Sequence, residues 1–251
     1  MRMRACLVMG FLLGGAGLSA RAAAEAPAVP SKAKGAALAL DMISQIPDQS
    51  SVVYGVLRVY PAPRKTNEFA MRFAIEIKAG RWLATYDATN AAGREAHLVV
   101  THTPNSTNHY ELTERASAGA PPVTRTLAGA ETMVPFADSD FWVADFGLEF
   151  FHWPDQSLLK TEMRRSRSCY ILESSQPKPA PGGYTKVISS IHVESGGIVQ
   201  AEAFDAGGTR FKLFEPSKIE KISGVYQLKE MKISNDKTRS RSVLTFDLEE
   251  K

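Results

Sequence analysis

The fold of this chain is decided by the stretch FAMRFAIEI, residues 69–77. Every odd-numbered position is apolar, whereas Arg72 and Glu76 stand among the even-numbered ones. A period of two is typical of an antiparallel strand that packs one face on a core and turns the other to solvent. The strand is therefore predicted to point Phe69, Met71, Phe73 and its other odd-numbered residues inward.

Runs of the same character fill the rest of the chain, and turns rich in Gly, Asn and Asp separate them. They are Val52–Tyr60, Trp82–Tyr86, His97–Thr103, His109–Arg115, Met163–Glu173, Tyr184–Glu194, Ile198–Asp205, Arg210–Glu215, Val225–Ser234 and Arg239–Leu248. With the first strand they number about 11, too many for a flat open sheet. The pattern predicts a mainly β fold, an incomplete and strongly curled antiparallel β-barrel.

The N-terminus has the features of a secretory signal peptide. Arg2 and Arg4 precede an apolar stretch, residues 7–18, that is too short to span a bilayer. Ala20-Arg21-Ala22 then offers the small residues of a cleavage site. We therefore expect residues 1–22 to be removed near Ala22 and the mature protein to be periplasmic.

The mature chain is expected to form one domain. Residues 23–36 are rich in Ala, Pro and Lys and predict a flexible leader. Near-helical apolar spacing over residues 36–46 predicts one short N-terminal helix, ended by Pro47. The β domain would span residues 37–251, with a helical insertion around residues 138–153.

Charge and cysteine content exclude several function classes. The chain has 30 basic and 27 acidic residues, and the signal peptide carries Arg2, Arg4 and Arg21 but no acidic residue, so the mature chain has 27 of each. Without a net or clustered positive charge, we expect no nucleic-acid partner. Cys169 is the only cysteine after residue 22, which excludes an intramolecular disulfide.

The segment FADSDFWVADFGLEFFHW, residues 136–153, departs from the strand pattern. It holds seven of the 22 aromatic residues of the chain. Apolar residues at helical spacing predict one or two short helices with a broad aromatic face. Two interpretations stay open: a plug that fills the core of the barrel, or a lid over an apolar ligand cavity.

No motif indicates catalysis or a metal centre. Asp145-Phe146-Gly147 lacks the other kinase motifs, and no nucleophile elbow is present. The histidines show no ligand spacing, and His97 and His102 fall on opposite faces of one strand. We therefore expect a protein that is not an enzyme and has no cofactor and no metal.

Arg164, Arg165 and Arg167 on the predicted strand at 163–173 form a basic run with Lys160. Charged residues of this kind protect the solvated edge of a sheet from aggregation. The alternative is a contact with anionic lipid head groups.

In its order of parts, the chain resembles the LolA-like outer-membrane lipoprotein-sorting proteins. The resemblance is carried by the stretches FADSDF at 136–141, RSCYILE at 167–173, YTKV at 184–187, QAEAFDAGG at 200–208 and MKISN at 231–235. It implies an incomplete antiparallel barrel closed by helices, with an apolar cavity for acyl chains. It also implies a periplasmic location in a bacterium with two membranes.

The function expected on these grounds is a periplasmic carrier for acylated molecules, above all in outer-membrane lipoprotein sorting. Its partners would be acylated lipoproteins or lipids, together with sorting components of the inner and outer membranes. An alternative is a non-enzymatic interaction or stress-sensing module of the envelope. The residues expected to line the cavity or lid are Phe69, Met71, Phe73, Ile75, Phe141, Trp142, Phe146, Phe150 and Trp153.

Export predicts a defined N-terminus. Protein recovered from the periplasm should begin at Ala23, within about two residues, because the small residues at 20–22 fit a signal peptidase site. N-terminal sequencing measures this directly. Periplasmic protein that begins at Met1 would contradict the prediction.

Overall fold

The computed structural model describes residues 30–63, 65–104, 106–222 and 225–248. The predicted signal peptide and residues 23–29 of the predicted leader lie outside these ranges. Within them, no helix combines the length and the apolar character needed to cross a membrane.

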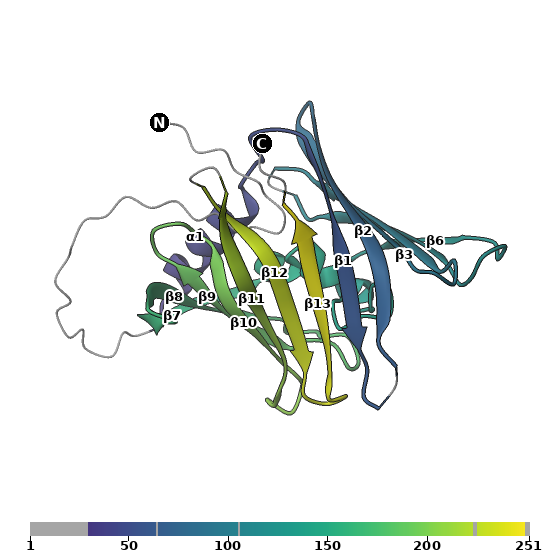
Figure 1. Ribbon diagram of the computed structural model, residues 1–251. Helices are drawn as coiled ribbons and strands as arrows, with labels where there is room; N and C mark the ends of the chain where they lie inside the picture. Colours follow the sequence, from purple (N-terminus) through teal and green to yellow (C-terminus); the bar gives the residue numbers. More distant parts are fainter. Residues whose placement is uncertain (1–29, 64, 105, 223–224, 249–251) are drawn as a thin grey trace.

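One antiparallel sheet dominates the structure (Figure 1). Its first six strands are β1 (Ser51–Tyr60), β2 (Asn67–Lys78), β3 (Arg81–Thr89), β4 (Glu95–His102), β5 (His109–Arg115) and β6 (Val123–Leu127). The others are β7 (Asp155–Arg164), β8 (Arg167–Ser175), β9 (Lys186–His192), β10 (Ile198–Phe204), β11 (Arg210–Ile222), β12 (Val225–Asn235) and β13 (Ser240–Asp247).

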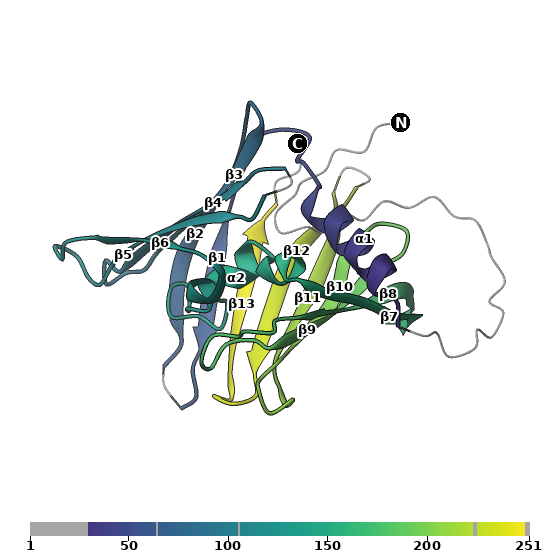
Figure 2. The same ribbon diagram turned by 180° about the vertical axis from the view of Figure 1, so that it is seen from behind.

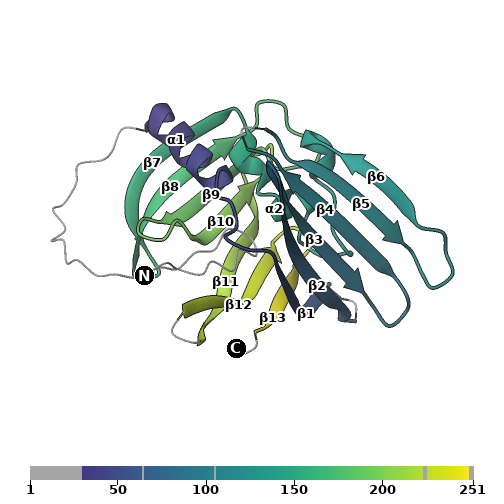
Figure 3. The same cartoon turned by 90° about the horizontal axis from the view of Figure 1, so that it is seen from above.

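The order of the strands is β6-β5-β4-β3-β2-β1-β13-β12-β11-β10-β9-β8-β7. Pairing of β1 with β13 joins the two halves of the chain into one sheet. The sheet curves strongly but β6 and β7 do not pair, so it does not close into a barrel (Figure 3). The mainly β, curled and incomplete architecture predicted from the sequence is confirmed.

The strand count differs from the predicted one because 13 strands form instead of about 11. The predicted strand Met163–Glu173 is wrong: it is the end of β7, a turn and most of β8. Arg165 and Ser166 make this turn with φ angles of 49° and 61°. A type I′ hairpin turn needs positive φ at both central residues, and glycine, asparagine or aspartate usually supplies it. An Arg-Ser turn therefore gave no signal, and neither did β6, whose residues 123–126 are exposed.

The basic run lies at this turn and on β7, which is an edge strand of the sheet. Arg165 forms an ion pair with Glu215, and Arg164 and Lys160 both pair with Glu162. The arrangement fits the interpretation of a charged, solvated sheet edge.

The alternating strand occupies β2, and its odd-numbered residues face the core as predicted. Phe69, Met71, Phe73 and Ile75 expose at most 6% of their surface. Ile77 is 37% exposed because it lies at the end of β2, beyond the packed core. A tight hairpin follows, with Lys78 paired to Arg81 and Gly80 at φ +72°.

The N-terminal helix α1 (Lys32–Ile43) packs on the edge strand β7. It begins four residues before the predicted start at 36 and ends three before the predicted end at 46. Ser31 explains the earlier start: its hydroxyl accepts from the amide of Lys34, and its backbone bonds Leu158 of β7 in both directions at 2.9 and 3.0 Å. Gly35 lets the helix approach closely, since a side-chain carbon there would lie 2.6 Å from the backbone of β7.

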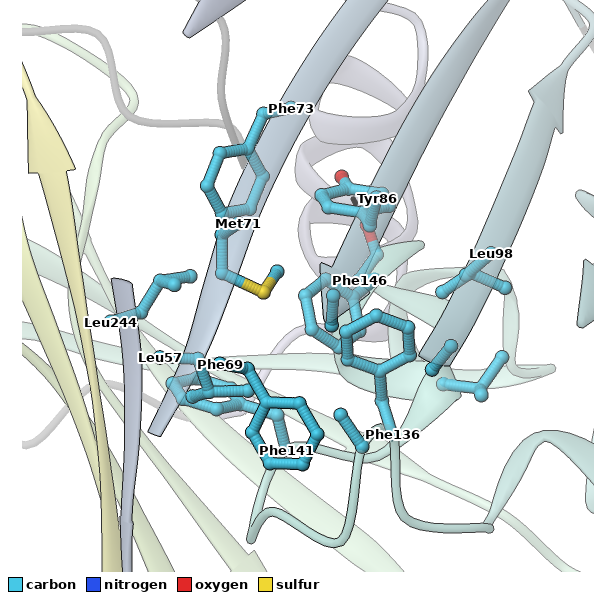
Figure 4. Packing of buried hydrophobic residues seen from close by; sticks show 14 of the residues in the cluster. Leu57, Phe69, Met71, Phe73, Tyr86, Leu98, Phe136, Phe141, Phe146 and Leu244 are labelled. Atoms are coloured by element: carbon cyan, nitrogen blue, oxygen red, sulfur yellow. Dashed lines mark hydrogen bonds between the residues drawn. The ribbon is translucent and has the colours of Figure 1, made fainter. Parts of the chain in front are cut away.

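The core forms two clusters on the concave face of the sheet. The first core cluster is built mainly from β1 to β5, β12 and β13 (Figure 4). The second core cluster lies between α1 and strands β8 to β11. Residues from the chain between β6 and β7 enter both clusters, so this segment joins the two halves of the core.

The inward face of β2 predicts a sharp difference between two substitutions. Phe73→Asp should lower the free energy of unfolding by about 3–5 kcal/mol, because it buries an unpaired carboxylate and leaves a cavity. Ala70→Asp, on the exposed face of the same strand, should cost about 1 kcal/mol or less. Urea unfolding of both variants tests this, and equal losses would contradict the assignment of faces.

Candidate functional site

The chain between β6 and β7, residues 128–154, crosses the concave face of the sheet (Figure 2). It contains three short helical turns: η1 (Gly129–Thr132), α2 (Val143–Phe146) and η2 (Glu149–His152). We call residues 128–154 the crossing segment. The helical insertion predicted around residues 138–153 lies within it.

The first half of the crossing segment is part of the packed core. Phe136, Phe141 and Phe146 expose at most 3% of their surface. The Phe146 ring lies 4.9 Å from that of Phe136, 5.9 Å from that of Phe141 and 4.6 Å from that of Tyr86 on β3. Figure 4 shows these rings among side chains of the sheet. This half of the segment therefore plugs the core, as one of the two open interpretations predicted.

Polar contacts fix the plug to β13. The carboxylate of Asp140 accepts hydrogen bonds from the hydroxyls of Ser240 at 2.5 Å and Ser242 at 2.8 Å. The backbone amide of Asp140 donates to the Ser242 oxygen at 2.8 Å. These bonds satisfy a 7%-exposed carboxylate and set the register between the plug and the sheet.

A buried lysine lies under the start of α2. Lys212 on β11 is 1% exposed, and its ammonium donates to the carbonyl of Asp140 at 2.7 Å and to the Tyr184 hydroxyl at 3.0 Å. It also lies 3.5 Å from the centre of the Trp142 ring, where a cation–π attraction acts. Burial lowers the pKa of Lys212 to about 7, although the nearby carboxylates of Asp145 and Asp140 oppose this shift.

Asp145 completes this network. It accepts hydrogen bonds from the Tyr184 hydroxyl at 3.0 Å and from the backbone amide of Trp142 at 2.7 Å. Burial raises the pKa of Asp145, and the charge of Lys212 opposes the rise. The bond to Trp142 caps α2, and the Trp142 ring stacks on Tyr184 with centroids 4.6 Å apart. Sequence reasoning assigned neither Lys212 nor Tyr184 to the site: Lys212 belongs to no motif, and Tyr184 entered only through the stretch YTKV that carries the resemblance.

An apolar cavity lies beside this network, between the second half of the crossing segment and the sheet. Its volume, measured as the space that the centre of a water molecule can occupy, is about 30 Å³. Asp145 and Lys212 are its only ionisable lining groups other than a tyrosine. The lining residues are Asp145, Leu148, Phe150, Tyr184, Val187, Ile198, Ala201, Ala203, Lys212, Phe214 and Ile233.

A second cavity, of about 40 Å³ by the same measure, lies on the other side of the crossing segment. It is more polar, and it is bounded by the end of α1, by β3 and β4, and by residues 146–152. The lining residues are Met42, Ile43, Gln45, Trp82, Tyr86, His102, Phe146, Gly147, Leu148 and His152. Leu148 lines both cavities.

Two neighbouring residues, Gly147 and Leu148, are under unusual steric and conformational constraints. A side chain at Gly147 would overlap the hydroxyl of Tyr110, so only glycine fits there. Leu148 has a φ of 49°, a left-handed conformation that costs roughly 1–2 kcal/mol outside glycine. Strain of this kind is concentrated at ligand clamps and switch regions.

Buried polar groups hold this part of the segment. The Tyr110 hydroxyl donates to Glu149 at 2.8 Å, and the Asn108 amide donates to the carbonyl of Gly147 at 2.7 Å. Burial raises the pKa of Glu149 to about 7, against the opposing effect of the bond from Tyr110.

His102 lies at the inner side of the second cavity. Its ring stacks on Trp82 with centroids 3.7 Å apart, and burial lowers its pKa to about 3, with a further contribution from His152. The Nε2 atom is buried and has no hydrogen-bond partner among the described residues. Strand alternation had placed His102 opposite to His97, and its inward orientation follows from the buried Leu98 and Val100.

The nine residues predicted to contact a ligand are divided between the core and the cavities. Phe150 lines the apolar cavity and Phe146 lines the second cavity. Six of the others are buried, and Trp142 is half-buried, packed against the second core cluster. The seven that line neither cavity are Phe69, Met71, Phe73, Ile75, Phe141, Trp142 and Trp153. Their contact with a ligand stays a prediction.

The described residues offer no metal centre, since no three His, Cys, Asp or Glu side chains among them are grouped to hold an ion. Cys169 on β8 is fully buried, and burial raises the pKa of its thiol. A free cysteine in such a buried position packs as a small apolar residue.

A protein-family model described as an uncharacterized protein matches residues 122–249, half of the 251-residue chain. The chain belongs to this family. The matched range includes β6, the whole crossing segment and all of β7 to β13. No curated protein sequence matches the chain significantly.

Several solved structures have the same fold as this protein. A DUF1329 family protein from Desulfovibrio piger is similar with a TM-score of 0.67 at 18% identity, over 86% of this chain and 91% of its own. A putative outer membrane lipoprotein-sorting protein domain from Vibrio parahaemolyticus gives 0.65 at 15% identity, over 87% and 92%. A LolA superfamily protein from Nitrosomonas europaea gives 0.56 at 14% identity, over 86% and 91%. The fold is LolA-like, as the resemblance implied.

The raised pKa of Glu149 predicts a pH-dependent effect of Glu149→Gln. The folded pKa, about 7, lies above the ordinary value of 4.5, so the native protein loses stability as the pH rises between these values. The neutral glutamine removes this loss while still accepting from Tyr110. The variant should gain about 1–3 kcal/mol over the parent at pH 8 and much less at pH 4.5.

Urea unfolding of the parent and of Glu149→Gln at both pH values measures this difference. The depressed pKa of His102 makes the folded state more stable as the pH rises, which is the opposite trend. This contribution is the same in the parent and the variant, so it cancels when their free energies of unfolding are compared. A gain that is the same at both pH values would contradict the assignment to Glu149.

Proposed function

We propose that this protein is a periplasmic, non-enzymatic carrier of acylated molecules, with lipoproteins of the outer membrane as its first candidates. The observation that supports it best is the apolar cavity between the sheet and residues 148–150, on the concave face of a LolA-like fold. The putative lipoprotein-sorting domain from Vibrio parahaemolyticus shares this fold.

The cavity must enlarge to admit an acyl chain. A volume of about 30 Å³ holds a few water molecules at most, whereas ligand pockets are commonly about 300–1,000 Å³. The first half of the crossing segment is too firmly packed to be the moving part. The second half, residues 147–153, borders both cavities and contains only the four-residue turn η2.

The energies allow such an opening. Besides the bonds from Asn108 and Tyr110, residues 147–153 are held by the Gln156 amide, which donates to the carbonyls of Phe150 and Trp153 at 2.9 and 3.0 Å. Each such bond contributes about 1 kcal/mol net. Burial of one methylene gains about 0.8 kcal/mol, so a chain of about 14 methylenes gains roughly 11 kcal/mol. That gain exceeds the cost of breaking these four side-chain bonds and the bond from the Leu148 amide to the Asp145 carbonyl, and it leaves several kcal/mol to offset repacking of Phe150 and Trp153.

The second candidate is a non-enzymatic interaction or stress-sensing module of the envelope. It is favoured by the filled first core cluster and by Val52 and Tyr54, which are 50% and 58% exposed on the outer face of β1. Such a module needs no enlarged cavity, and a binding assay with an acyl probe separates the two functions.

The carrier function predicts that filling the apolar cavity abolishes acyl binding. Ala203 on β10 lines the cavity, and Ala203→Leu adds three carbons where little free volume exists. Binding of a fluorescent fatty acid should weaken by at least about tenfold, a change of 1.4 kcal/mol. Ala70→Leu makes the same change on the exposed face of β2 and should leave binding unchanged.

The two variants and the parent are compared by probe titration, with urea unfolding to confirm that each is folded. Mass spectrometry of an organic extract of the parent, purified from its own periplasm, identifies acylated species directly. A parent that binds no probe and yields no acylated species would overturn the carrier function in favour of the interaction module. Equal binding by folded Ala203→Leu and the parent would overturn the assignment of the cavity.

A further inference from the structure

The second cavity differs in chemistry from the apolar one although Leu148 lines both. Its lining includes two imidazoles, those of His102 and His152, together with the indole of Trp82 and the amide of Gln45. It contains no lysine or arginine. Glu149 is an acidic residue of the crossing segment. It directly follows Gly147 and Leu148, which line the cavity.

His102 supplies a hydrogen-bonding atom that nothing in the described structure uses. Its ring is held between Trp82 and the cavity, and its Nε2 is buried without a partner. A neutral imidazole that donates through its other nitrogen presents Nε2 as an acceptor. A buried acceptor without a partner is costly, and a ligand donor would satisfy it.

Leu148 is placed to connect the two cavities. Its side chain lines both, its backbone is in the left-handed region, and the preceding Gly147 is the point where the packed plug ends. Rotation of this one residue would join an apolar chamber to a polar one. The joined space would suit a molecule with a long apolar tail and a small polar group.

We propose that the second cavity binds the polar linkage of an acylated ligand, a neutral group that donates a hydrogen bond to His102 Nε2, while the acyl chain passes Leu148 into the apolar cavity. This inference rests on the proposed carrier function and specifies its ligand class. Hydroxyl-bearing acyl esters and acyl amides fit the site.

An anionic head group fits the site poorly. Burial keeps His102 and His152 neutral by lowering the pKa of both rings. No cation lines the cavity, and the carboxyl group of Glu149 lies on the adjoining residue. A carboxylate or phosphate would therefore lose its hydration without gaining an ion pair.

The experiment compares two competitors with the same chain: 1-monolauroylglycerol, which carries hydroxyls, and lauric acid, which carries a carboxylate at neutral pH. Each displaces a fluorescent fatty acid from the full mature protein. The parent should prefer the neutral ester by about tenfold or more. His102→Phe, which keeps the stack on Trp82 but removes the acceptor, should reduce the ratio to near one and change lauric acid binding little.

His97→Phe is the matched control, because His97 lies on the outer face of the same strand, paired with Asp87 at 2.5 Å. It should keep the preference of the parent. The inference is overturned if the parent shows no preference between the two competitors, or if His102→Phe keeps the preference of the parent. In either case the carrier function stands if both competitors bind. Failure of the parent to bind the probe or either competitor overturns both.

Discussion

The structure depends on one requirement: the concave face of a curved sheet that does not close must be covered. The 13 strands bend around a large apolar surface, and the two edge strands, β6 and β7, do not pair to seal it. A closed barrel would bury this face with its own side chains. Here the crossing segment and α1 bury it instead, and this explains why the aromatic residues are concentrated at 136–153. The chain between the two edge strands is therefore part of the core.

Apolar packing alone would leave the crossing segment free to settle in several positions. Its position is specified by buried polar groups from the opposite half of the chain. Ser240 and Ser242 bond Asp140, while Lys212 and Tyr184 bond the backbone of Asp140 and the carboxylate of Asp145. Buried charges are expensive unless they are fully bonded, so only one arrangement satisfies them all. Burial of these groups disfavours their charged forms, and this is why the pKa of Lys212 is lowered and the pKa of Asp145 is raised.

Strand patterns were readable from the sequence where an apolar face meets the core and the turns have standard chemistry. The alternation of residues 69–77 and the Ala79-Gly80 hairpin are of this kind. The Arg165-Ser166 turn was not, because its positive φ angles are imposed by the surrounding hairpin and not by the residues themselves. The start of α1 was missed for a related reason, since Ser31 and Gly35 obtain their roles from contact with β7.

Long-range contacts explain why the site was harder to predict than the fold. Trp142 and Phe146 are spaced by one helical turn, which suggested a shared face directed at a ligand. In the structure α2 is only four residues long and begins after Trp142, so the two rings separate. Trp142 stacks on Tyr184 from the second half of the sheet, whereas Phe146 packs on Tyr86 from the first. Lys212, Tyr184 and Tyr110 meet the segment across 39 to 72 residues of sequence, a distance at which no local pattern operates.

The two interpretations of the aromatic segment, plug and lid, are reconciled by the place where its packing changes. Up to Phe146 the segment is bonded to β13 and enclosed by aromatic rings, so its release would expose much of the first core cluster. Residue 147 must be a glycine because Tyr110 occupies the space that a side chain would need. The backbone of the next residue, Leu148, is in the left-handed conformation. Beyond this point the chain borders cavities on both sides. The residues that fill the core and the residues that the proposed carrier function requires to move are therefore different ones, divided at Gly147.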